Sequence, residues 1–417
     1  MSLEFNYYSL GDLVKIKYGK NQKKVQDDEN GKYPIYGTGG LMGYSIDYLY
    51  DKPSVLIGRK GSIEKVRYIE EPFWTVDTLF YTEVNDKIVI PKFLYYVMSL
   101  INLSRYNEGT SIPSLRTETL NRLDLPIPNL DYQKRVLTVL SNIDKKISLN
   151  KKINKNLEQL IKYIYINWFE EFEPFKDKDF YDTKLGSIPV GWDVKPLQEF
   201  IKFQEGPGIR NWQYVEEDGI NFLNIRCIQN NDLVLDTANM ISKEEANGKY
   251  AHFMLNEWDL VISSSGTLGR YAIVREEHLP LCLNTSIIRF TPMHSFDHYA
   301  YVYSYLTSRG FYHYLLTMGS GSVQLNFGPT HLKQIDLIVP PENILKKYND
   351  LIFPLIEQMV TIKSEISKLT KLRDTLLPKL MSGEIDVSKI NCDLELKYNY
   401  MKYLFNQIHK QLSKSVV

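Results

Sequence analysis

Two long stretches of the chain place apolar residues alternately four and three positions apart. The first runs from Val136 to Trp168, and the second runs from Tyr348 to Leu376. This spacing is typical of the seam of a coiled coil and predicts two long helices. The seam residues on which this prediction depends are Leu140, Ile143, Ile147, Asn150, Asn154 and Leu157 in the first helix, and Ile352, Leu355, Met359, Ile362, Ile366 and Leu369 in the second.

Connectivity gives these helices an expected direction. The first helix leads into a globular segment that ends where the second helix begins, so paired seams would run antiparallel. Asn150 and Asn154 would then face hydrophobic partners and fix the register at some cost in stability. Pro341 suits the first turn of the second helix, and Pro354 should kink it. The alternative is two amphipathic helices that pack separately, each on its own domain.

The segments that precede the two helices match when one is shifted along the chain. The shift is 212 near the helices, 205 farther upstream and 187 at the start. Ordered agreement with a growing shift indicates two diverged copies of one unit, with insertions in the loops of the second. The matched positions include Leu10 with Leu197, Gly19 with Gly206, Leu56-Ile57 with Val261-Ile262, Gly61-Ser62-Ile63 with Gly266-Thr267-Leu268, Gly109-Thr110 with Gly321-Ser322, Leu123-Asp124-Leu125 with Ile335-Asp336-Leu337, and Pro128 with Pro340.

Short apolar runs bounded by turn residues predict strands within each copy. They cover residues 14–18, 54–57, 79–81, 259–262 and 286–290, and a helix is expected over 91 to about 107 and over 295 to about 317. The predicted fold is therefore α/β (α+β). It has two similar mixed domains separated by an antiparallel two-helix coiled-coil spacer, with pseudo-two-fold symmetry.

Composition narrows the class of protein. Lysine plus arginine equals aspartate plus glutamate at 50 each, so net charge gives no support to nucleic-acid binding. The three cysteines show no paired spacing, and the amino terminus lacks a basic segment followed by an apolar run, which predicts a cytoplasmic protein. No stretch approaches the roughly 20 apolar residues of a membrane helix, so no membrane role is expected.

Catalytic signatures are missing from the sequence. The seven histidines begin at His252 and show no metal-ligand spacing. Gly37-Thr38-Gly39-Gly40 lacks the lysine and hydroxyl of a phosphate-binding loop and reads as a turn. Val339-Pro340-Pro341-Glu342, the only double proline, reads as a helix start rather than as the loop of a base-modifying methyltransferase. The sequence predicts a binding module with no catalytic residue, bound metal or cofactor of its own.

Two similar domains held apart by a rod suit duplex DNA, a long ligand with reading sites at fixed separation. Arg and Lys can pair with guanine, Gln and Asn with adenine, and hydroxyls with phosphates. The candidate DNA contacts are polar residues beside the repeated glycines: Lys17, Lys20, Lys23, Lys24, Arg59, Lys60, Ser62, Thr110 and Ser111 in the first copy, and Gln204, Arg210, Ser263, Ser264, Ser265, Thr267, Ser320, Ser322, Gln324 and Asn326 in the second. Ordinary solvated loops are the alternative.

The copies differ at these candidate positions. Arg59 and Lys60 become Ser264 and Ser265, while the flanking glycine and apolar positions match. Side chains of different chemistry would read different bases. The expected target is an asymmetric DNA sequence in two parts.

Three segments resemble the specificity subunits of Type I restriction-modification systems. Residues 167–175 (NWFEEFEPF) resemble the end of the family's central helix, and residues 186–192 (GSIPVGW) resemble the linker that opens its second recognition domain. Residues 372–385 (LRDTLLPKLMSGEI) are similar to the family's closing signature. The likeness extends over nearly the whole chain in architecture.

The resemblance implies a domain plan and partners. It implies a first target recognition domain over 1–128, a central spacer helix over 129–175, a linker and second recognition domain over 176–340, a second spacer helix over 341–380, and a tail over 381–417. It also implies assembly on double-stranded DNA with two methyltransferase subunits and, in the full complex, restriction subunits that act as motors. S-adenosylmethionine and ATP would bind to those partners.

Two other functions compete with this interpretation. A protein-interaction scaffold with duplicated binding domains would fit the neutral net charge. A stand-alone methyltransferase or nuclease would need the pockets that the sequence lacks.

Overall fold

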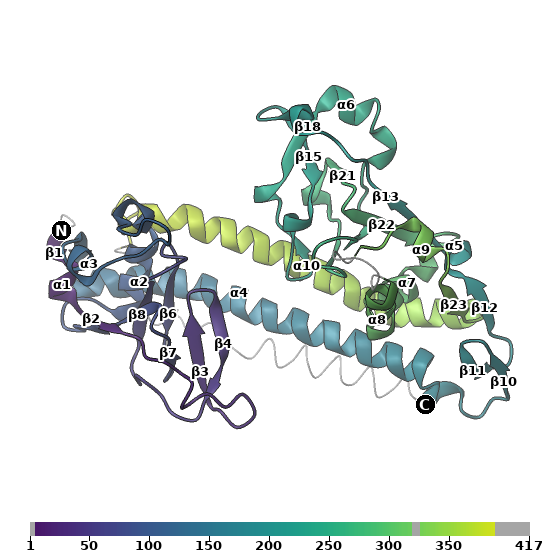
Figure 1. Cartoon of the computed structure of the whole chain (residues 1–417), viewed down its shortest axis with the longest axis horizontal. Coiled ribbons are helices and arrows are strands. Elements are labelled where there is room, and N and C mark those ends of the chain that lie inside the picture. Colours follow the sequence, from purple (N-terminus) through teal and green to yellow (C-terminus); the bar gives the residue numbers. More distant parts are fainter. Residues whose placement is uncertain (1–4, 319–325, 388–417) are drawn as a thin grey trace. The chain divides into compact units, whose positions relative to one another are not determined.

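The computed structural model describes residues 5–318 and 326–387 and divides into two compact units. Unit 1 contains the described residues up to Ile147 and those from Leu369 onward, and unit 2 contains Ser148–Lys368. Each unit is a mixture of strands and helices, so the predicted α/β class is confirmed (Figure 1). Each unit also includes a segment of both long helices, α4 (Leu130–Tyr165) and α10 (Glu342–Met381).

Unit 1 is built on an antiparallel sheet with the strand order β2–β8–β5–β6. A second sheet has the order β4–β3–β7, in which β3 and β7 are parallel, and β1 pairs with β9. The strands of unit 1 are β1 (Phe5–Ser9), β2 (Val14–Tyr18), β3 (Tyr33–Gly37), β4 (Gly40–Ser45), β5 (Ser54–Gly58), β6 (Val66–Ile69), β7 (Trp74–Thr75), β8 (Leu79–Val84) and β9 (Asp124–Pro128).

Unit 2 repeats this plan. Its main antiparallel sheet has the order β13–β22–β19–β20, a second sheet has the order β14–β18–β15–β21 with β15 parallel to β21, and β12 pairs with β23. The strands of unit 2 are β10 (Phe180–Thr183), β11 (Gly186–Pro189), β12 (Asp193–Pro196), β13 (Ile201–Glu205), β14 (Tyr214–Val215), β15 (Gly219–Leu223), β16 (Ile228–Gln229), β17 (Asp232–Leu233), β18 (Asn239–Ser242), β19 (Leu260–Ser263), β20 (Tyr271–Ile273), β21 (Leu281–Leu283), β22 (Ile287–Pro292) and β23 (Asp336–Val339).

Helices other than α4 and α10 are short. The α-helices are α1 (Leu10–Leu13), α2 (Pro91–Ser99), α3 (Thr117–Asn121), α5 (Leu197–Phe200), α6 (Lys243–Asn247), α7 (Tyr299–Leu306), α8 (Arg309–Met318) and α9 (Pro329–Leu332). Single turns of 3-10 helix cover Leu103–Tyr106, Glu173–Phe175, Asn211–Gln213, Ile225–Cys227, Leu235–Thr237, Ala251–Phe253, Glu276–His278 and Phe296–His298, and a π-helical turn covers Ile166–Glu170.

The sequence predicted the strands more accurately than the helices between them. All five predicted strands are present as β2, β5, β8, β19 and β22, and 38–39 form the turn between β3 and β4. The predicted helix over 91–107 is wrong after Ser99, and the one over 295–317 breaks at Thr307 and Ser308. Thr307 caps its own helix by donating its hydroxyl to the Tyr303 carbonyl, and Ser308 starts the next helix by accepting from Phe311 N.

Both long helices begin one residue after the predicted start, and α10 ends one residue after its predicted end. The α-helical part of α4 stops at Tyr165, ten residues before the predicted end at 175, because a π turn follows. Pro341 precedes α10 rather than lying in its first turn, and its carbonyl accepts from Ile344 N at 2.9 Å. Helix α10 continues through Pro354 without a break.

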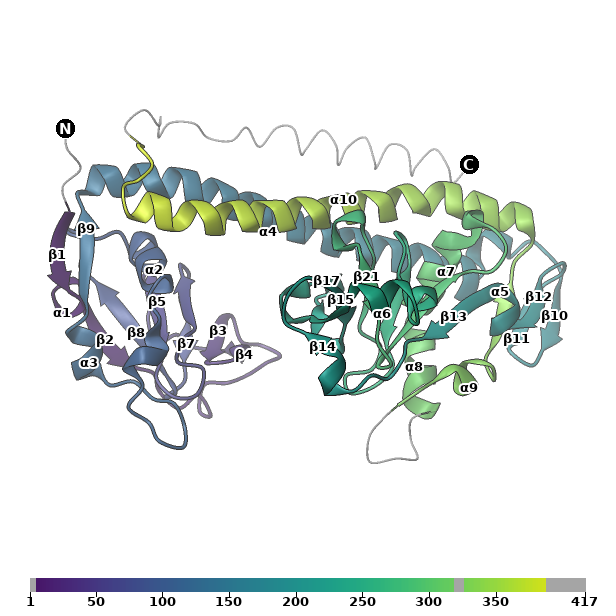
Figure 2. The ribbon, with the colours of Figure 1, turned by 90° about the horizontal axis from the view of Figure 1, so that it is seen from above.

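A helix lies between the main sheet and the long helices in each unit. In unit 1, α2 packs on β5 and β6 (Figure 2). The Tyr96 hydroxyl of α2 bonds to Asp144 of α4. In unit 2, α7 packs on β22, and its backbone N–H at Ala300 donates to the Asn349 side chain of α10. The domain core in each unit is therefore continuous with apolar side chains of the long helices.

Within each unit α4 and α10 run antiparallel. In unit 1 the Tyr132 hydroxyl donates to the Leu380 carbonyl at 2.8 Å, and Asp144 pairs with Arg373 at 3.3 Å. In unit 2 Asn150 donates to Glu365. Leu377, Leu380 and Met381 of α10 thereby complete the core of unit 1 around Val136 and Leu140 of α4, and Ile352, Ile356 and Met359 lie in the core of unit 2 with Leu157 and Ile161.

Candidate nucleic-acid interface

Three chain segments of unit 1 meet at the end of β5. Arg59 N donates to the Thr78 carbonyl at 2.9 Å, and Leu115 N donates to the Arg59 carbonyl at 2.9 Å. Lys60 forms a β-bridge with Ser114. We call this arrangement of residues 59–61, 78 and 113–115 the first loop junction.

Unit 2 contains the same arrangement at the end of β19. Ser264 N donates to the Ser286 carbonyl at 2.9 Å, and Phe327 N donates to the Ser264 carbonyl at 3.0 Å. Ser265 forms a β-bridge with Asn326. Residues 264–266, 286 and 326–327 therefore form a second loop junction that shares these two backbone bonds and the β-bridge with the first, which extends the predicted duplication to the level of hydrogen bonds.

Glycines allow the tight backbone of both junctions. Gly61 has a φ of +85° and Gly266 a φ of +67°, a region that residues with a side chain rarely adopt. Gly19 and Gly206 follow β2 and β13, and a Cβ at either would lie 2.6 Å or less from backbone atoms of Val76 or Asn284. The glycine pairs that the repeat brings into register thus hold the loops close together.

The first loop junction carries two cationic side chains, of which one contacts other groups of the protein and the other forms no ion pair within the described ranges. The Arg59 guanidinium donates to the Asp77 carbonyl at 2.9 Å and lies 5.0 Å from the centre of the Tyr18 ring. Lys60 is exposed and forms no ion pair with a described residue. Arg59 is thus held in place beside a free ammonium. Thr110 and Ser111 are exposed on the adjoining loop, and Ser62 is half-buried.

The predicted lysine cluster of unit 1 is separated by the structure into a loop and a strand. Lys20, Lys23 and Lys24 are exposed on the loop after β2, whose backbone is fixed by a bond from Trp74 Nε1 to the Lys20 carbonyl at 2.9 Å. Lys17 lies within β2 and is 3.8 Å from Glu83. Only the three loop lysines of this cluster present ammonium groups that pair with no acidic residue in the described part of the chain.

Among the described residues, fewer of the candidate DNA-contact residues are exposed at the second loop junction than at the first. Ser263 and Ser264 are buried, and the Ser263 hydroxyl donates to the Thr267 carbonyl and accepts from Arg270 N, so it supports the turn instead of facing solvent. Thr267 and Asn326 are exposed, and Ser265 is half-buried. Ser320, Ser322 and Gln324 lie outside the described residues.

Gln204 and Arg210, the remaining candidates, lie near the loop that follows β13. Gln204 is half-buried, and its side-chain oxygen accepts a bond from Arg289. Arg289 also donates to the Met254 carbonyl and pairs with Asp259 at 3.4 Å. Arg210 is exposed. Arg210 is therefore open to a ligand, whereas Gln204 belongs to an internal network.

The predicted seam residues of both long helices are buried or half-buried. The prediction that Asn150 and Asn154 face hydrophobic partners is wrong for Asn150. Its amide donates to a Glu365 oxygen at 2.8 Å, because α10 places a carboxylate opposite it. The side-chain oxygen of Asn154 is buried and has no hydrogen-bond partner among the described residues.

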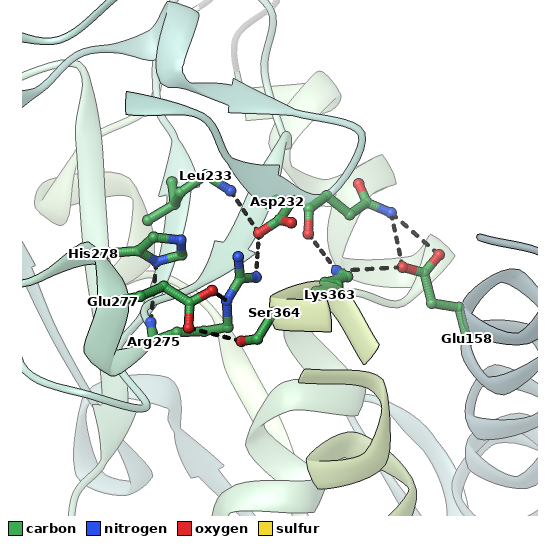
Figure 3. A network of polar contacts seen from close by, with 9 residues as sticks. Glu158, Asp232, Leu233, Arg275, Glu277, His278, Lys363 and Ser364 are labelled. Atoms are coloured by element: carbon green, nitrogen blue, oxygen red, sulfur yellow. Dashed lines mark hydrogen bonds and ion pairs between the residues drawn. The ribbon is translucent and has the colours of Figure 1, made fainter. Parts of the chain in front are cut away.

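A partly buried ionic cluster joins the globular part of unit 2 to its long helices (Figure 3). Lys363 of α10 lies 3.7 Å from Glu158 of α4 and donates to the Asn231 carbonyl in the turn between β16 and β17. The Asn231 amide in turn donates to Glu158 at 3.3 Å. Asn230 and Asn231 have φ angles of 52° and 58°, which asparagine tolerates in a two-residue hairpin turn.

The cluster continues through a buried arginine. Arg275, whose side chain is 3% exposed, pairs with Asp232 and with Glu277, the latter at 2.9 Å. The other oxygen of Glu277 accepts from the Ser364 hydroxyl of α10 at 2.8 Å. We call Glu158, Asp232, Arg275, Glu277 and Lys363 the Lys363 cluster. Because its members come from both long helices and from the domain, it fixes the domain against the helices.

Burial changes the acid–base properties of this cluster. Burial lowers the pKa of the Lys363 ammonium, although Asp232 and Glu158 oppose that change. Burial raises the pKa of Glu277, but the bonds from Ser364 and Arg275 outweigh it, so the net pKa is lowered.

In unit 1 a smaller group of contacts joins the domain to the long helices, and we call such a group an anchor. Its central group is the carboxylate of Asp144, whereas the central group in unit 2 is the ammonium of Lys363. Asp144 of α4 accepts a bond from the Tyr96 hydroxyl of α2, lies 4.0 Å from Lys92 of the same helix, and pairs with Arg373 of α10. Burial and the bond to Asp144 raise the pKa of Tyr96. A single carboxylate therefore does in unit 1 what the Lys363 cluster does in unit 2.

One exposed residue of this surface was not among the candidates predicted from the sequence. Trp212 lies in the loop between β13 and β14 and is 81% exposed. An isolated tryptophan that follows Gly206-Pro207-Gly208 in a polar loop was the available signal. No periodic pattern surrounds it, so neither a strand face nor a helix face drew attention to it.

Metal-binding and membrane-spanning features are absent from the described part of the chain. Residues 5–318 and 326–387 contain no group of three or more His, Cys, Asp and Glu side chains placed to hold a metal ion. No helix in the same residues has both the length and the apolar character needed to cross a membrane. Cys227 and Cys282 are buried and unpaired.

Known proteins with similar sequences share one description. The chain is 29% identical over 366 residues to the Type I restriction enzyme MjaIX specificity subunit of Methanocaldococcus jannaschii, which covers 82% of this chain and 80% of that protein. It is 23% identical over 403 residues to the MjaVIII specificity subunit of the same organism, covering 92% and 93%. It is 22% identical over 379 residues to the HindI specificity subunit of Haemophilus influenzae, covering 75% and 81%.

A solved structure shares the fold. The S subunit of a Type I restriction-modification system from M. genitalium matches with a TM-score of 0.57 at 19% identity, over 91% of this chain and 96% of that one. The sequence profile described as "Type I restriction modification DNA specificity domain" matches residues 3–159 and again 189–371, once for each repeat. The chain therefore belongs to the family of Type I restriction-modification DNA specificity proteins.

Proposed function

We propose that this chain is the DNA-reading specificity subunit of a Type I restriction-modification enzyme and that each unit reads one part of a bipartite site. The observation that carries the proposal is the loop junction, which occurs twice with the same backbone bonds and different side chains. A fixed backbone positions a protein on DNA, while variable side chains specify bases. The two parts of the site would differ in sequence, because unit 1 presents Arg59 and Lys60 where unit 2 presents Ser264 and Ser265.

The long helices would set the distance between those parts. We propose that α4 and α10 form an antiparallel coiled-coil spacer that separates the recognition domains, 1–128 and 176–340, with pseudo-two-fold symmetry. The antiparallel contacts within each unit support this role. A helix of 40 residues is about 60 Å long at 1.5 Å per residue, enough to place two domains about one DNA turn or more apart.

Catalysis would reside in partner proteins. We propose a non-catalytic, cytoplasmic subunit that binds two methyltransferase subunits and, in the full complex, restriction subunits. S-adenosylmethionine and ATP would bind to those partners, and this chain would hold no cofactor. The names of the relatives, which are specificity subunits of restriction enzymes, support this division of labour.

Methylation mapping tests the proposal directly. A host that carries this chain and its methyltransferase should methylate one asymmetric two-part sequence across its genome. Removing seven residues from α4 and the seven opposite residues from α10 should change the gap and leave both parts readable, because one heptad preserves the seam. No methylated motif, together with no DNA complex at low salt in the presence of the methyltransferase, would contradict the proposal.

A further inference from the structure

Trp212 is unusual among the five tryptophans of the chain. Trp74 and Trp192 are buried, and Trp168 and Trp258 pack within aromatic clusters. Trp212 is 81% exposed, and its ring contacts no other aromatic ring among the described residues. Tryptophan is seldom left in water at this extent, and exposed indole rings are common where proteins bind partners.

The loop that carries Trp212 is held firmly on both sides of it. Arg210 N donates to the Gln213 side-chain oxygen at 2.9 Å, and Gln213 N donates back to the Arg210 carbonyl at 2.9 Å. The Gln213 amide also donates to Glu245 at 2.9 Å and to the Tyr250 hydroxyl at 3.1 Å. The indole therefore projects from a fixed backbone and does not need to be ordered when a ligand binds.

The loop that carries Trp212 begins next to the second loop junction. The loop leaves β13 at Gly206, where a Cβ would lie 2.5 Å from the Asn284 backbone, and Asn284 accepts a bond from Ile287 N beside Ser286 of the junction. The equivalent loop of unit 1 leaves β2 at Gly19 and carries Lys20, Lys23 and Lys24. Unit 1 thus presents ammonium groups where unit 2 presents an arginine and an indole.

The repeat also shows what an ordinary apolar residue does at this place. Val25 occupies the position of Trp212 under the shift of 187, and it packs against Ile35, Trp74 and Val76. Trp212 has no such neighbours among the described residues, although Ile209 of the same loop packs onto the cluster of Ile220 and Phe222. The half-buried Ile209 therefore already attaches the loop to the domain core, and Trp212 is not needed for that contact.

We propose that Trp212 binds duplex DNA directly, placing its indole against bases of the half-site read by unit 2 while Arg210 contacts a phosphate. This inference rests on the proposed function and adds a contact to it. A flat apolar ring can stack on a base or enter between base steps, and a neighbouring guanidinium neutralises the backbone. Unit 2 would thus recognise its half-site through an aromatic contact, whereas unit 1 uses cations.

The first test measures DNA affinity of the complete complex with the methyltransferase. Trp212→Ala should weaken binding to the methylated motif about 5- to 150-fold, the range expected when one aromatic side chain no longer stacks on a base. Trp212→Tyr should restore most of the affinity. Tyr7→Ala, which removes a 74% exposed aromatic ring from unit 1, is the matched control and should change the affinity by less than about twofold.

The second test reads the environment of the indole. The emission of Trp212 is the difference between the wild-type complex and the Trp212→Phe complex, and its quenching by acrylamide should fall when the cognate duplex is added. Protection by the methyltransferase alone, before DNA is added, would overturn the inference in favour of a protein contact.

The outcomes separate this inference from the function on which it rests. If the wild-type complex binds its motif and Trp212→Ala binds it equally well, the inference fails and the proposed function stands. If the wild-type complex binds no DNA, the proposed function fails and the inference fails with it.

Discussion

The two units share a backbone and differ in the chemistry that they present on it. Both loop junctions have the same pair of backbone hydrogen bonds and the same β-bridge, yet the first carries Arg59 and Lys60 where the second carries a buried Ser264 and a half-buried Ser265. Their anchors to the long helices also differ, with a carboxylate at the centre of one and an ammonium at the centre of the other. Duplication has preserved the backbone of the loop junctions while their side chains diverged. The anchors do not occupy equivalent positions, because the shift of 212 places Asp144 on Ile356 and not on Lys363.

The largest expected difference between the units concerns their anchors. Lys363→Met should lower the free energy of unfolding of unit 2 by about 3 kcal/mol, the lower end of the range for breaking a buried ion pair, because it leaves the half-buried Glu158 without its cation. Asp144→Asn should cost unit 1 about 1–3 kcal/mol, because the neutral amide can still accept the bond from Tyr96. Urea denaturation followed by tryptophan emission reports mainly on unit 2, which contains four of the five tryptophans.

A second substitution checks the cause. Glu158→Gln added to Lys363→Met removes the stranded carboxylate and should recover at least half of the stability that the single substitution removes. If the double variant is as unstable as the single one, the destabilisation comes from packing, and the comparison of charged anchors fails.

The loop junctions should differ by a smaller amount. Lys60→Ala should weaken methylation at one half-site about 5- to 150-fold, the value of one specific base contact, and leave the other half-site unchanged. Ser265→Ala, at the equivalent position, should affect only the other half-site and by less than about tenfold. Methylation rates on duplexes with one substituted base pair measure both effects, and equal weakening at both half-sites would refute the assignment of one unit to each.

The loops after β2 and β13 should differ in their response to salt. Replacing Lys20, Lys23 and Lys24 by alanine should make the slope of log affinity against log salt concentration less steep by up to about 2.7, because each phosphate that is no longer neutralised changes the slope by about 0.9. Arg210→Ala should change the slope by about 0.9. Affinity titrations between low and moderate salt give the slopes, and a change as large for Arg210 as for the three lysines would remove this distinction.

The smallest expected effect is on pH dependence. The pKa of Lys363 is lowered in the folded protein, so between that pKa and the ordinary value of 10.5 the unfolded chain binds more protons. The stability of the wild type should therefore rise with pH in that window relative to Lys363→Met, by less than about 1.4 kcal/mol per pH unit. Urea unfolding of both proteins across the window tests this, and a difference that shrinks as pH rises would contradict the sign.

The sequence correctly predicted the helices and strands that follow a periodic apolar pattern. It did not predict features that depend on the hydrogen bonds of single polar groups. The heptad spacing located both long helices, and alternation located the strands β2, β5, β8, β19 and β22. The break at Thr307 and Ser308 depends on two hydroxyls that bond to the backbone, which no apolar pattern signals. Glu365 opposite Asn150 likewise could not be predicted, because the relative register of the helices decides it.

The sequence predicted where the loops of the candidate interface lie, but not which of their side chains are exposed. The repeat pointed to the loops at Gly61 and Gly266, which do form matching junctions. It could not show that Ser263 turns inward to close its own loop or that Gln204 is engaged by Arg289, since both depend on tertiary contacts. The exposure of Trp212 likewise depends on the tertiary fold and has no signal in the repeat.

The contact between Tyr132 and Leu380 joins residues 248 positions apart, and it has a consequence for biosynthesis. A ribosome finishes every residue of unit 2 before it makes Leu377, Leu380 and Met381, which complete the core of unit 1. The nascent amino-terminal domain must wait with Val136 and Leu140 uncovered, and contacts this distant in sequence form slowly. Chaperone dependence during translation should accordingly concentrate on the half of the protein that is made first.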